Sequence, residues 1–454
     1  MSLPPATHNR PEALGPRSRA EFERARRITP GGSMRLASYF APHPPFAARG
    51  SGAWITDVDG RRIFDCANNF FSLIHGHAFA PVIDTLREGL DEGTAFGIPT
   101  VHEIELANEI CGRSPRAEQV RFVNSGTEAV MFAVKAARGI TGRHAIAKFE
   151  GAYHGAYDPV EISLDPTPQN WGDHVPASVA YARGSPPSLL YDTLVLPFDD
   201  PSSCRQLLEE NGHRLAAVVF DPLASRAGMV PADQRLLESL TDCCRKFGVL
   251  LVLDEVISYR LGYHGAHHEF GLEPDLVALA KIIGGGLPIG AVAGPARHMA
   301  IFDHTKGKPV VAHGGTFSAN PLSMMAGLMT LRSYDETAVA RLNGIGQRLR
   351  DALNEQFLRR ALPAQATGMG SLFRLHLTRR LIAGYRSCFP SPSQKQALAA
   401  IHFCLLERGF LLTPNCSGAL STPMTGHEVE ATGAAIVEAV SDIFATHGWS
   451  DRTP

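Results

Sequence analysis

The sequence predicts an α/β fold in which a mostly parallel sheet is covered by helices on both faces. Two observations support this prediction: short runs rich in β-branched residues occur from residue 120 onward, and they alternate with helix-patterned segments. Such alternation is typical of parallel sheets whose strands are joined by helices. The expected strands are residues 120–123, 145–149, 216–220, 249–253, 276–280 and 291–293.

The segments on either side of this region have a different pattern. Residues 1 to about 30 are rich in Pro, Arg and Ala and predict a frayed tail that leads to a short helix around 20–28. After Pro321 the pattern is helical to residue 358, followed by a strand at 373–377 and helices near 394–407 and 428–445. We therefore expect three parts: residues 1–80, which join a small domain; a large domain over 81–335; and a small α+β domain over 336–454.

Composition and charge favour small-molecule partners. The 43 basic and 45 acidic residues give a net charge of −2, which provides no electrostatic footprint for nucleic acid or an anionic membrane. No apolar run approaches the roughly 18 to 20 residues that a membrane helix needs. The eight cysteines form no CxxC pair or small-domain framework, so we expect a soluble protein of the reducing cytoplasm.

We expect no metal site. His264, His267 and His268 could suggest one, but no matching fourth ligand accompanies them, and loop histidines are the simpler interpretation.

Residues 121–130 predict a strand, a tight turn at Ser125, Gly126 and Thr127, and then a helix. The unpaired N–H groups and the positive dipole end at such a junction favour a phosphate. The alternative is that Ser125 and Thr127 only cap the helix, since Ser and Thr are ordinary N-cap residues.

Asp254 lies just past an apolar strand, at the sheet edge where ligands of parallel sheets gather. A buried acid there needs a cationic or hydrogen-bonding partner. A pyridinium nitrogen would serve, because an ionised carboxylate keeps that nitrogen protonated and lets the ring accept electrons. The alternative is an Asp that caps the next helix.

Lys281 ends another apolar strand and is followed closely by Gly284, Gly285 and Gly286. Glycines let a ligand approach the backbone, and low polarity lowers the pKa of a lysine toward nucleophilic competence. The alternative is a lysine whose amine reaches solvent beside a flexible loop.

Two further segments are suited to the same ligand. Residues 313–321 form a glycine-rich turn with hydroxyls before a helix, and residues 150–155 offer Tyr153 for stacking on a planar ring. Turn chemistry and core packing are the simpler explanation of each segment by itself.

Five motifs in this order resemble the class III aminotransferases, a family that uses pyridoxal 5′-phosphate: NSGTEA (124–129), GAYHG (151–155), DEV (254–256), AKIIGGG (280–286) and GTFSANP (315–321). The resemblance runs from about residue 30 to 331 and continues more loosely to the C-terminus. It implies a fold-type-I enzyme whose large domain binds the cofactor, and a homodimer with active sites at the subunit interface.

The resemblance also implies roles for single residues. Lys281 would form a Schiff base with the cofactor and move the proton, and Asp254 would pair with the pyridine nitrogen. The remaining cofactor-binding residues would be Ser125, Gly126 and Thr127 at the phosphate, with Thr316 of the partner subunit; Tyr153 and Val256 on the two ring faces; and His154, Asp221 and Arg226 nearby.

Departures from the family pattern bear on the substrate. Residues 30–42 look similar to the β-phenylalanine aminotransferase branch, in which the arginine at the place of Arg35 binds a substrate carboxylate. The second carboxylate arginine of that branch is replaced near Asn415. Phe70 stands where the glutamate-1-semialdehyde aminomutases of this family have tryptophan, and residues 93–99 resemble an aminomutase loop.

Asp221 and Arg226 are a second departure, because the family usually has Glu before this proline and a small residue or Asn at the place of Arg226. The guanidinium of Arg226 could hold the cofactor's phenolic oxygen or a substrate acid. The alternative is a loop residue that faces solvent.

The leading hypothesis is transamination between a carboxylated amino donor, for which a β-amino acid is one candidate, and a keto acid. The alternatives are an aminomutase reaction, an epimerase or lyase reaction on the same groups, and a scaffold that has lost catalysis.

Overall fold

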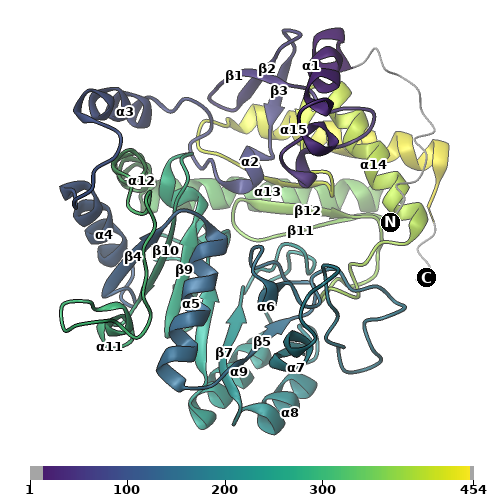
Figure 1. Ribbon diagram of the computed structural model, residues 1–454. Coiled ribbons are helices and arrows are strands. Elements are labelled where there is room, and N and C mark those ends of the chain that lie inside the picture. The colour runs from purple at the N-terminus through teal and green to yellow at the C-terminus, as the bar shows by residue number, and fades with distance from the viewer. Residues whose placement is uncertain (1–13, 450–454) are drawn as a thin grey trace.

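The computed structural model describes residues 14–449 and contains a seven-stranded sheet at its centre (Figure 1). Six strands run in one direction, and β10 is antiparallel to both of its neighbours. The mostly parallel sheet predicted from the sequence is therefore confirmed. Its strand order is β4 (Gln119–Val123), β10 (Gly290–Gly294), β9 (Leu276–Ala280), β8 (Leu250–Asp254), β7 (Leu215–Phe220), β5 (Ala145–Phe149) and β6 (Thr193–Leu196).

Helices cover both faces of this sheet. Alternate residues of a strand point to opposite faces, so each strand contributes side chains to both layers of contact. In β5, Ala145 and Phe149 pack in a core cluster with helices α8 (Pro201–Asn211) and α9 (Gln234–Phe247), whereas Ile146 packs with α5 (Gly126–Thr141). Helix α5 presents small buried residues spaced three or four apart, which lets it lie close against the strands. Figure 1 shows α5 crossing one face of the sheet.

The other helices of this region lie around the sheet. Helix α12 packs against α3 and α4, beside the sheet edge formed by β4. The helices are α3 (Ala80–Glu92), α4 (Val101–Arg113), α6 (Asp158–Glu161), α7 (Ser188–Asp192), α10 (Ala266–Glu269), α11 (Ala296–Met299) and α12 (Pro321–Ser333). Among residues 14–449, no helix has both the length and the apolar character needed to cross a membrane.

The C-terminal part forms a smaller α+β unit, in agreement with the sequence pattern. Its sheet has the order β11-β12-β14 and is antiparallel. The elements are α13 (Glu336–Arg359), β11 (Gln365–Thr367), β12 (Leu372–His376), α14 (Pro392–Glu407), β14 (Ser417–Ala419) and α15 (Gly426–His447). Capping boxes at Ser391 and Thr425 fix the starts of α14 and α15.

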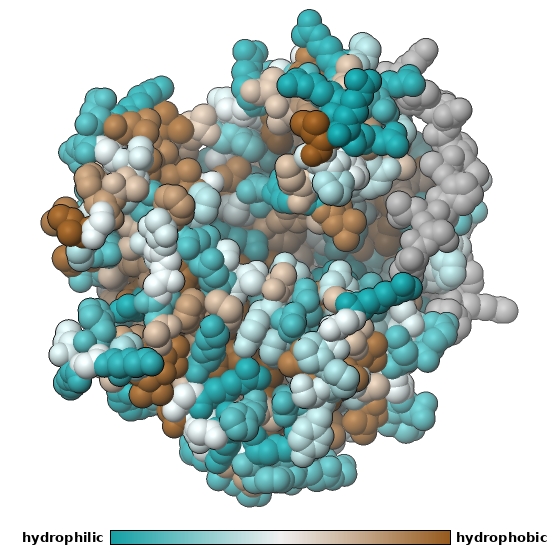
Figure 2. Space-filling view, in the orientation of Figure 1, coloured by the Kyte–Doolittle hydropathy of each residue, from teal (hydrophilic) through white to brown (hydrophobic). Residues whose placement is uncertain are grey.

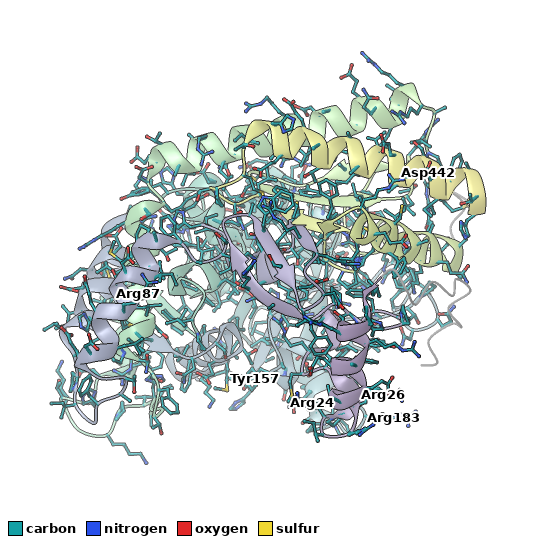
Figure 3. All side chains as sticks on the ribbon, turned by 90° about the horizontal axis from the view of Figure 1, so that it is seen from above. Arg24, Arg26, Arg87, Tyr157, Arg183 and Asp442 are labelled. Atoms are coloured by element: carbon teal, nitrogen blue, oxygen red, sulfur yellow. The ribbon has the colours of Figure 1, made fainter. Side chains whose placement is uncertain are left out.

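The N-terminal segment pairs with this C-terminal unit. Strands β1 (Ala47–Ser51), β2 (Trp54–Asp57) and β3 (Arg62–Asp65) form a sheet that β13 (Phe410–Leu411) completes by parallel pairing with β3. Seen from above, α1 (Pro16–Arg26), which carries Arg24 and Arg26, lies on the opposite side of the molecule from α3 with Arg87 (Figure 3). The segment thus runs from the small unit to the large sheet, and α2 (Asn68–Phe71) lies between them.

Candidate active site

Four chain segments with chemically active side chains meet at one edge of the large sheet. Asp254 is the last residue of β8, and Lys281 follows the neighbouring strand β9, with which β8 pairs in parallel. Asp221 follows β7 on the other side of β8. Because β10 is antiparallel to both β4 and β9, strand β4 runs in the same direction as β9, and Ser125 after β4 reaches the same edge.

A cavity of about 350 Å³ opens at this edge. Figure 2 shows the molecule hollowed between its upper part, which holds the small unit, and its lower part, which holds the large sheet. Nine of the residues predicted from the sequence line the cavity: Ser125, Gly126, Thr127, Tyr153, His154, Asp221, Asp254, Val256 and Lys281. The structure therefore brings together residues that are distant in the sequence.

Asp254 and His154 form a buried pair. The imidazole Nδ1 of His154 lies 2.7 Å from Oδ2 of Asp254, and the amide of Val256 donates to Oδ1 at 3.0 Å. The other ring nitrogen of His154, Nε2, is buried and has no hydrogen-bond partner among the described residues. An ionised carboxylate has about four lone-pair sites, so Asp254 can accept a third hydrogen bond, from a cationic ring N–H, beside these two.

Lys281 is half-buried and has a φ of 54°, in the left-handed region that a non-glycine residue adopts only at a cost of about 1–3 kcal/mol. Such strain is concentrated at functional sites. Burial lowers the pKa of the Lys281 amine, and the nearby carboxylates of Asp254 and Asp221 partly oppose this effect. A lowered pKa increases the fraction of uncharged, nucleophilic amine.

Asp221 is a buried carboxyl that accepts from the amide of Leu223 at 3.0 Å and from the side chain of Ser258. Burial, followed by repulsion from Asp254, raises the pKa of Asp221 to about 7. The charge of Asp254 therefore disfavours the ionised form of Asp221.

The start of α5 forms the other end of the cavity. The hydroxyl of Ser125 accepts from the amide of Glu128 at 3.2 Å, so Ser125 is the N-cap, as the alternative interpretation predicted. The first-turn amides of Gly126 and Thr127 have no acceptor within the helix and open onto the cavity, which favours an anion there. Gly155 must be glycine, since its φ is 91° and a Cβ would lie 2.6 Å from Oγ1 of Thr127.

The other four predicted residues lie outside this cavity lining. Arg226 is partly exposed, and its guanidinium pairs with Oδ1 of Asp165 at 3.1 Å. Its contact with the cofactor or a substrate acid stays a prediction. Thr316 is exposed in the loop before α12. Its contribution to the site of a partner subunit stays a prediction.

Arg35 and Phe70 line an adjacent cavity of about 400 Å³. The guanidinium of Arg35 lies over the Phe70 ring, 5.6 Å from its centroid, and donates to Oδ1 of Asn69 at 2.6 Å. Asn69 lines both cavities. The sequence pattern did not indicate Asn69, which lies in a run of four left-handed residues, Asn68–Phe71, with φ between 45° and 71°.

The histidines considered as metal ligands have protein partners. His267 lies 2.7 Å from Oε1 of Glu255 through Nδ1 and 2.9 Å from the hydroxyl of Ser114 through Nε2. His264 contacts the backbone carbonyl of Arg113.

Comparison with known proteins identifies the family. The family model for class-III aminotransferases matches residues 39–385. The chain belongs to this aminotransferase family. Among curated class-III relatives, glutamate-1-semialdehyde 2,1-aminomutase of Aeropyrum pernix is 36% identical over 427 residues, which cover 93% of this chain and 97% of the relative. The resemblance stated from the five motifs is confirmed.

Three solved structures of transaminases are similar to this chain. An omega-transaminase from Sphaerobacter thermophilus is 44% identical with a TM-score of 0.90, covering 94% of this chain and 97% of the other. A β-phenylalanine aminotransferase from Variovorax paradoxus is 32% identical with a TM-score of 0.84, covering 96% and 95%. A transaminase solved with pyridoxal phosphate bound is 38% identical with a TM-score of 0.88, covering 95% and 98%. The class-III chain therefore has the fold-type-I α/β architecture predicted for it.

Pyridoxal 5′-phosphate is the cofactor of this class-III enzyme. The residues at the cavity fit it: free amides at the start of α5 suit the phosphate, the amine of Lys281 suits the aldehyde, and the carboxylate of Asp254 suits the ring nitrogen. The unpartnered Nε2 of His154 also agrees with a polar group beside it.

Proposed function

We propose that this enzyme transfers an amino group between a carboxylated amino donor and a keto acid, with Lys281 as the catalytic lysine. The supporting observation is the common cavity of Lys281 and Asp254, where a lysine of lowered pKa faces a buried carboxylate. This combination is the one that amine chemistry on a pyridine ring requires.

Each cavity residue then has a role. The amides of Gly126 and Thr127, with the Ser125 hydroxyl nearby, would bind the phosphate, while Tyr153 and Val256 would enclose the ring from its two faces. When bound, pyridoxal phosphate supplies an electron sink for negative charge on the substrate carbon next to nitrogen. Asp254 would accept from the ring N–H, and His154 would hold Asp254 in place.

Lys281 would bind the cofactor in the resting enzyme and move the proton during the reaction. When the substrate has displaced the Lys281 amine from the cofactor, this amine would take the proton from the substrate carbon next to nitrogen. It would then return that proton to a carbon of the cofactor. The Asp221 carboxyl, whose pKa burial raises to about 7, lines the same cavity as this amine.

Arg35 supports a carboxylated donor. Its guanidinium has no acidic partner among the described residues, although it lines the cavity that adjoins the cofactor site through Asn69. An arginine without an acidic partner beside a reaction site can provide a bidentate contact for a carboxylate. The similarity to a β-phenylalanine aminotransferase supports a β-amino acid as the donor.

A second candidate is an aminomutase reaction, in which the amino group moves within one molecule. It is favoured by a relative named as a glutamate-1-semialdehyde 2,1-aminomutase, with 36% identity over most of both chains. An epimerase or lyase reaction would use the same lysine and carboxylate.

We also propose a homodimer in which Thr316 completes the phosphate site of the other subunit, and a cytoplasmic location. Supporting the dimer, large apolar side chains are exposed on α3, α4 and the loops beside them, among them Ile98, Val101, Ile104 and Phe317. Figure 2 shows hydrophobic surface on the flank where Figure 1 places α4. Activity measured over a dilution series beside sedimentation tests this, and a fully active monomer would refute it.

The experiment for the main proposal is a half-reaction. The cofactor-loaded protein is mixed with α- and β-amino acids and simple amines without acceptor, and its visible absorption is followed. Loss of the visible band that an added keto acid restores supports transfer. Conversion of a semialdehyde without any external keto acid supports the aminomutase, and an inert band with every donor contradicts both.

A further inference from the structure

Asn69 connects the two cavities of the site. It lines both the cofactor cavity and the adjacent cavity that contains Arg35, and its Oδ1 accepts from the guanidinium of Arg35 at 2.6 Å. Its Nδ2 donates to the hydroxyl of Ser72 at 3.0 Å, and Ser72 lines the cofactor cavity. A chain of hydrogen bonds therefore runs from Arg35 through Asn69 to the wall of the cofactor site.

The Asn69 side chain has a single orientation that satisfies both of its partners. A guanidinium carries only donors, so the amide oxygen must face Arg35. The amide nitrogen then faces the Ser72 hydroxyl, which in turn donates to the backbone carbonyl of Asn69 at 2.9 Å. These contacts fix the position of the oxygen that Arg35 uses.

The backbone of Asn69 is also held in place. Asn69 has a φ of 49° and lies in the left-handed run of residues 68–71. Oδ1 of Asp65 accepts from the amide of Asn68 at 2.8 Å, and the Asn68 side chain donates to the carbonyl of Ala419 at 2.7 Å. Strained backbone of this kind persists only where the surrounding structure enforces it, and it is concentrated at active sites and ligand clamps.

Arg35 lacks comparable support of its own. It is exposed and lies between two short 3₁₀ turns, Pro30–Gly32 and Leu36–Ser38. Its guanidinium contacts the Phe70 ring, and within residues 14–449 its described acceptor is Oδ1 of Asn69. A ligand that binds an unsupported arginine must first order a long side chain, which weakens binding.

The chemical type of the acceptor matters as well as its position. The amide oxygen of Asn69 is neutral, so it orders the Arg35 guanidinium and leaves the positive charge uncompensated. A guanidinium has five N–H donors, and one bond to Asn69 leaves others for a carboxylate. An aspartate at the same place would form an ion pair with Arg35 and compete with the substrate.

We infer that Asn69 is a positioning residue for the preference for carboxylated donors: it holds the Arg35 guanidinium at the boundary of the two cavities and keeps its charge available. This inference rests on the proposed function, since it deepens the description of the same site.

The test uses ligands without an amino group, so that binding is measured independently of turnover. Calorimetry on the cofactor-loaded enzyme compares 3-phenylpropanoate with 3-phenylpropanamide, which has the same apolar body and no charge. The acid should bind about tenfold more tightly than the amide. Asn69→Gly removes the side chain and tolerates the left-handed φ, and it should reduce this ratio about threefold.

Asn69→Asp distinguishes a positioning role from a structural one. Aspartate also tolerates this backbone conformation and keeps an acceptor, but its charge pairs with Arg35, so the ratio should fall to about one. In an Arg35→Ala background Asn69→Gly should leave the ratio unchanged, because Asn69 acts through Arg35. Asn69→Ser is the second truncated variant if Asn69→Gly does not fold.

Four results overturn the inference: no binding of the acid or a ratio near one in the unsubstituted enzyme, an unchanged ratio in the truncated or the Asp variant, an equal loss for acid and amide in the truncated variant, or a further fall of the ratio in the Arg35→Ala background. The proposed function fails separately: it fails if no amino donor changes the visible band, whatever the binding ratios are.

Discussion

The Nδ1 atom of His154 lies 2.7 Å from Oδ2 of Asp254, and both side chains are buried at the carboxyl edge of the large sheet. His154 comes from the loop after β5 and Asp254 ends β8, so this contact joins two strands that are not neighbours in the sheet. His154 thus holds the Asp254 carboxylate in the cavity that Lys281 also lines, and the lysine amine is not needed for this.

Removing His154 should weaken both stability and chemistry. His154→Phe leaves Oδ2 of Asp254 without this donor, so the free energy of unfolding of the cofactor-free protein should fall by about 1–3 kcal/mol. Urea unfolding measures it. His154→Asn is the matched control, because its amide can still donate; a loss as large in His154→Asn as in His154→Phe would show that the hydrogen bond is not the cause.

Asp254→Asn should separate binding from catalysis. The phosphate end of the site at the start of α5 is unchanged, so the variant should still bind the cofactor. Without the negative charge the ring nitrogen is not kept protonated, and proton removal from a deuterium-labelled donor should slow by about 10²-fold or more. Single-turnover kinetics measures this rate. An unchanged rate would mean that another group protonates the ring.

Asp221 should make stability depend on pH. An aspartic acid side chain in water has a pKa of 3.8, whereas the pKa of Asp221 in the folded protein is about 7. Between these values the folded protein binds more protons than the unfolded chain, so the free energy of unfolding should fall as the pH rises from about 4 to 7.

Asp221→Asn stays neutral and should lose this dependence. Urea unfolding of the cofactor-free protein and of the variant at pH 5, 6, 7 and 8 should give a stability difference that increasingly favours the variant as the pH rises. A difference that is constant over this range contradicts the raised pKa.

Arg35 should govern selectivity. If its guanidinium binds a substrate carboxylate, Arg35→Ala should weaken carboxylated donors by roughly 1.5 to 3 kcal/mol and leave simple amines little affected. The ratio of kcat/KM for one amino acid and one amine is the readout. Equal losses of kcat/KM for the amino acid and the amine would contradict a carboxylate-binding role of Arg35.

Arg226→Ala is the comparison for this experiment. Because Arg226 pairs with Asp165 outside the cofactor cavity, this change should leave the pH dependence of the visible band unaltered. A shifted spectrum, with all substrates slowed alike, would restore the predicted contact with the cofactor's phenolic oxygen.

The sequence predicted the parts of the fold that depend on local patterns. Apolar strands followed by Asp254 and Lys281 indicated a shared site, because the carboxyl ends of parallel strands meet at one edge. Strand β6 was missed because it is a short run, Thr193–Leu196, beside an exposed loop. The sheet of β1 to β3 was also missed, and its parallel pairing with β13 joins segments that lie far apart in the chain.

Within the site, the sequence indicated residues that follow strands but not those placed by tertiary contacts. Asn69 reaches both cavities only through a run of four left-handed non-glycine residues, whereas Asn normally adopts this conformation as a single residue. Arg226 was assigned from its place in a motif, and its contact with Asp165 could not be predicted from the sequence.

The most direct test of the account is to locate the lysine that holds the cofactor. Lys148 is the rival, since burial also lowers its pKa, to about 7, although its amine donates to the carbonyl of Ile162 at 2.8 Å. The cofactor-loaded protein is reduced with borohydride, digested and analysed by mass spectrometry. The account predicts the reduced cofactor mass on the peptide containing Lys281 and none in Lys281→Ala. The mass on Lys148 or on any other lysine would contradict it.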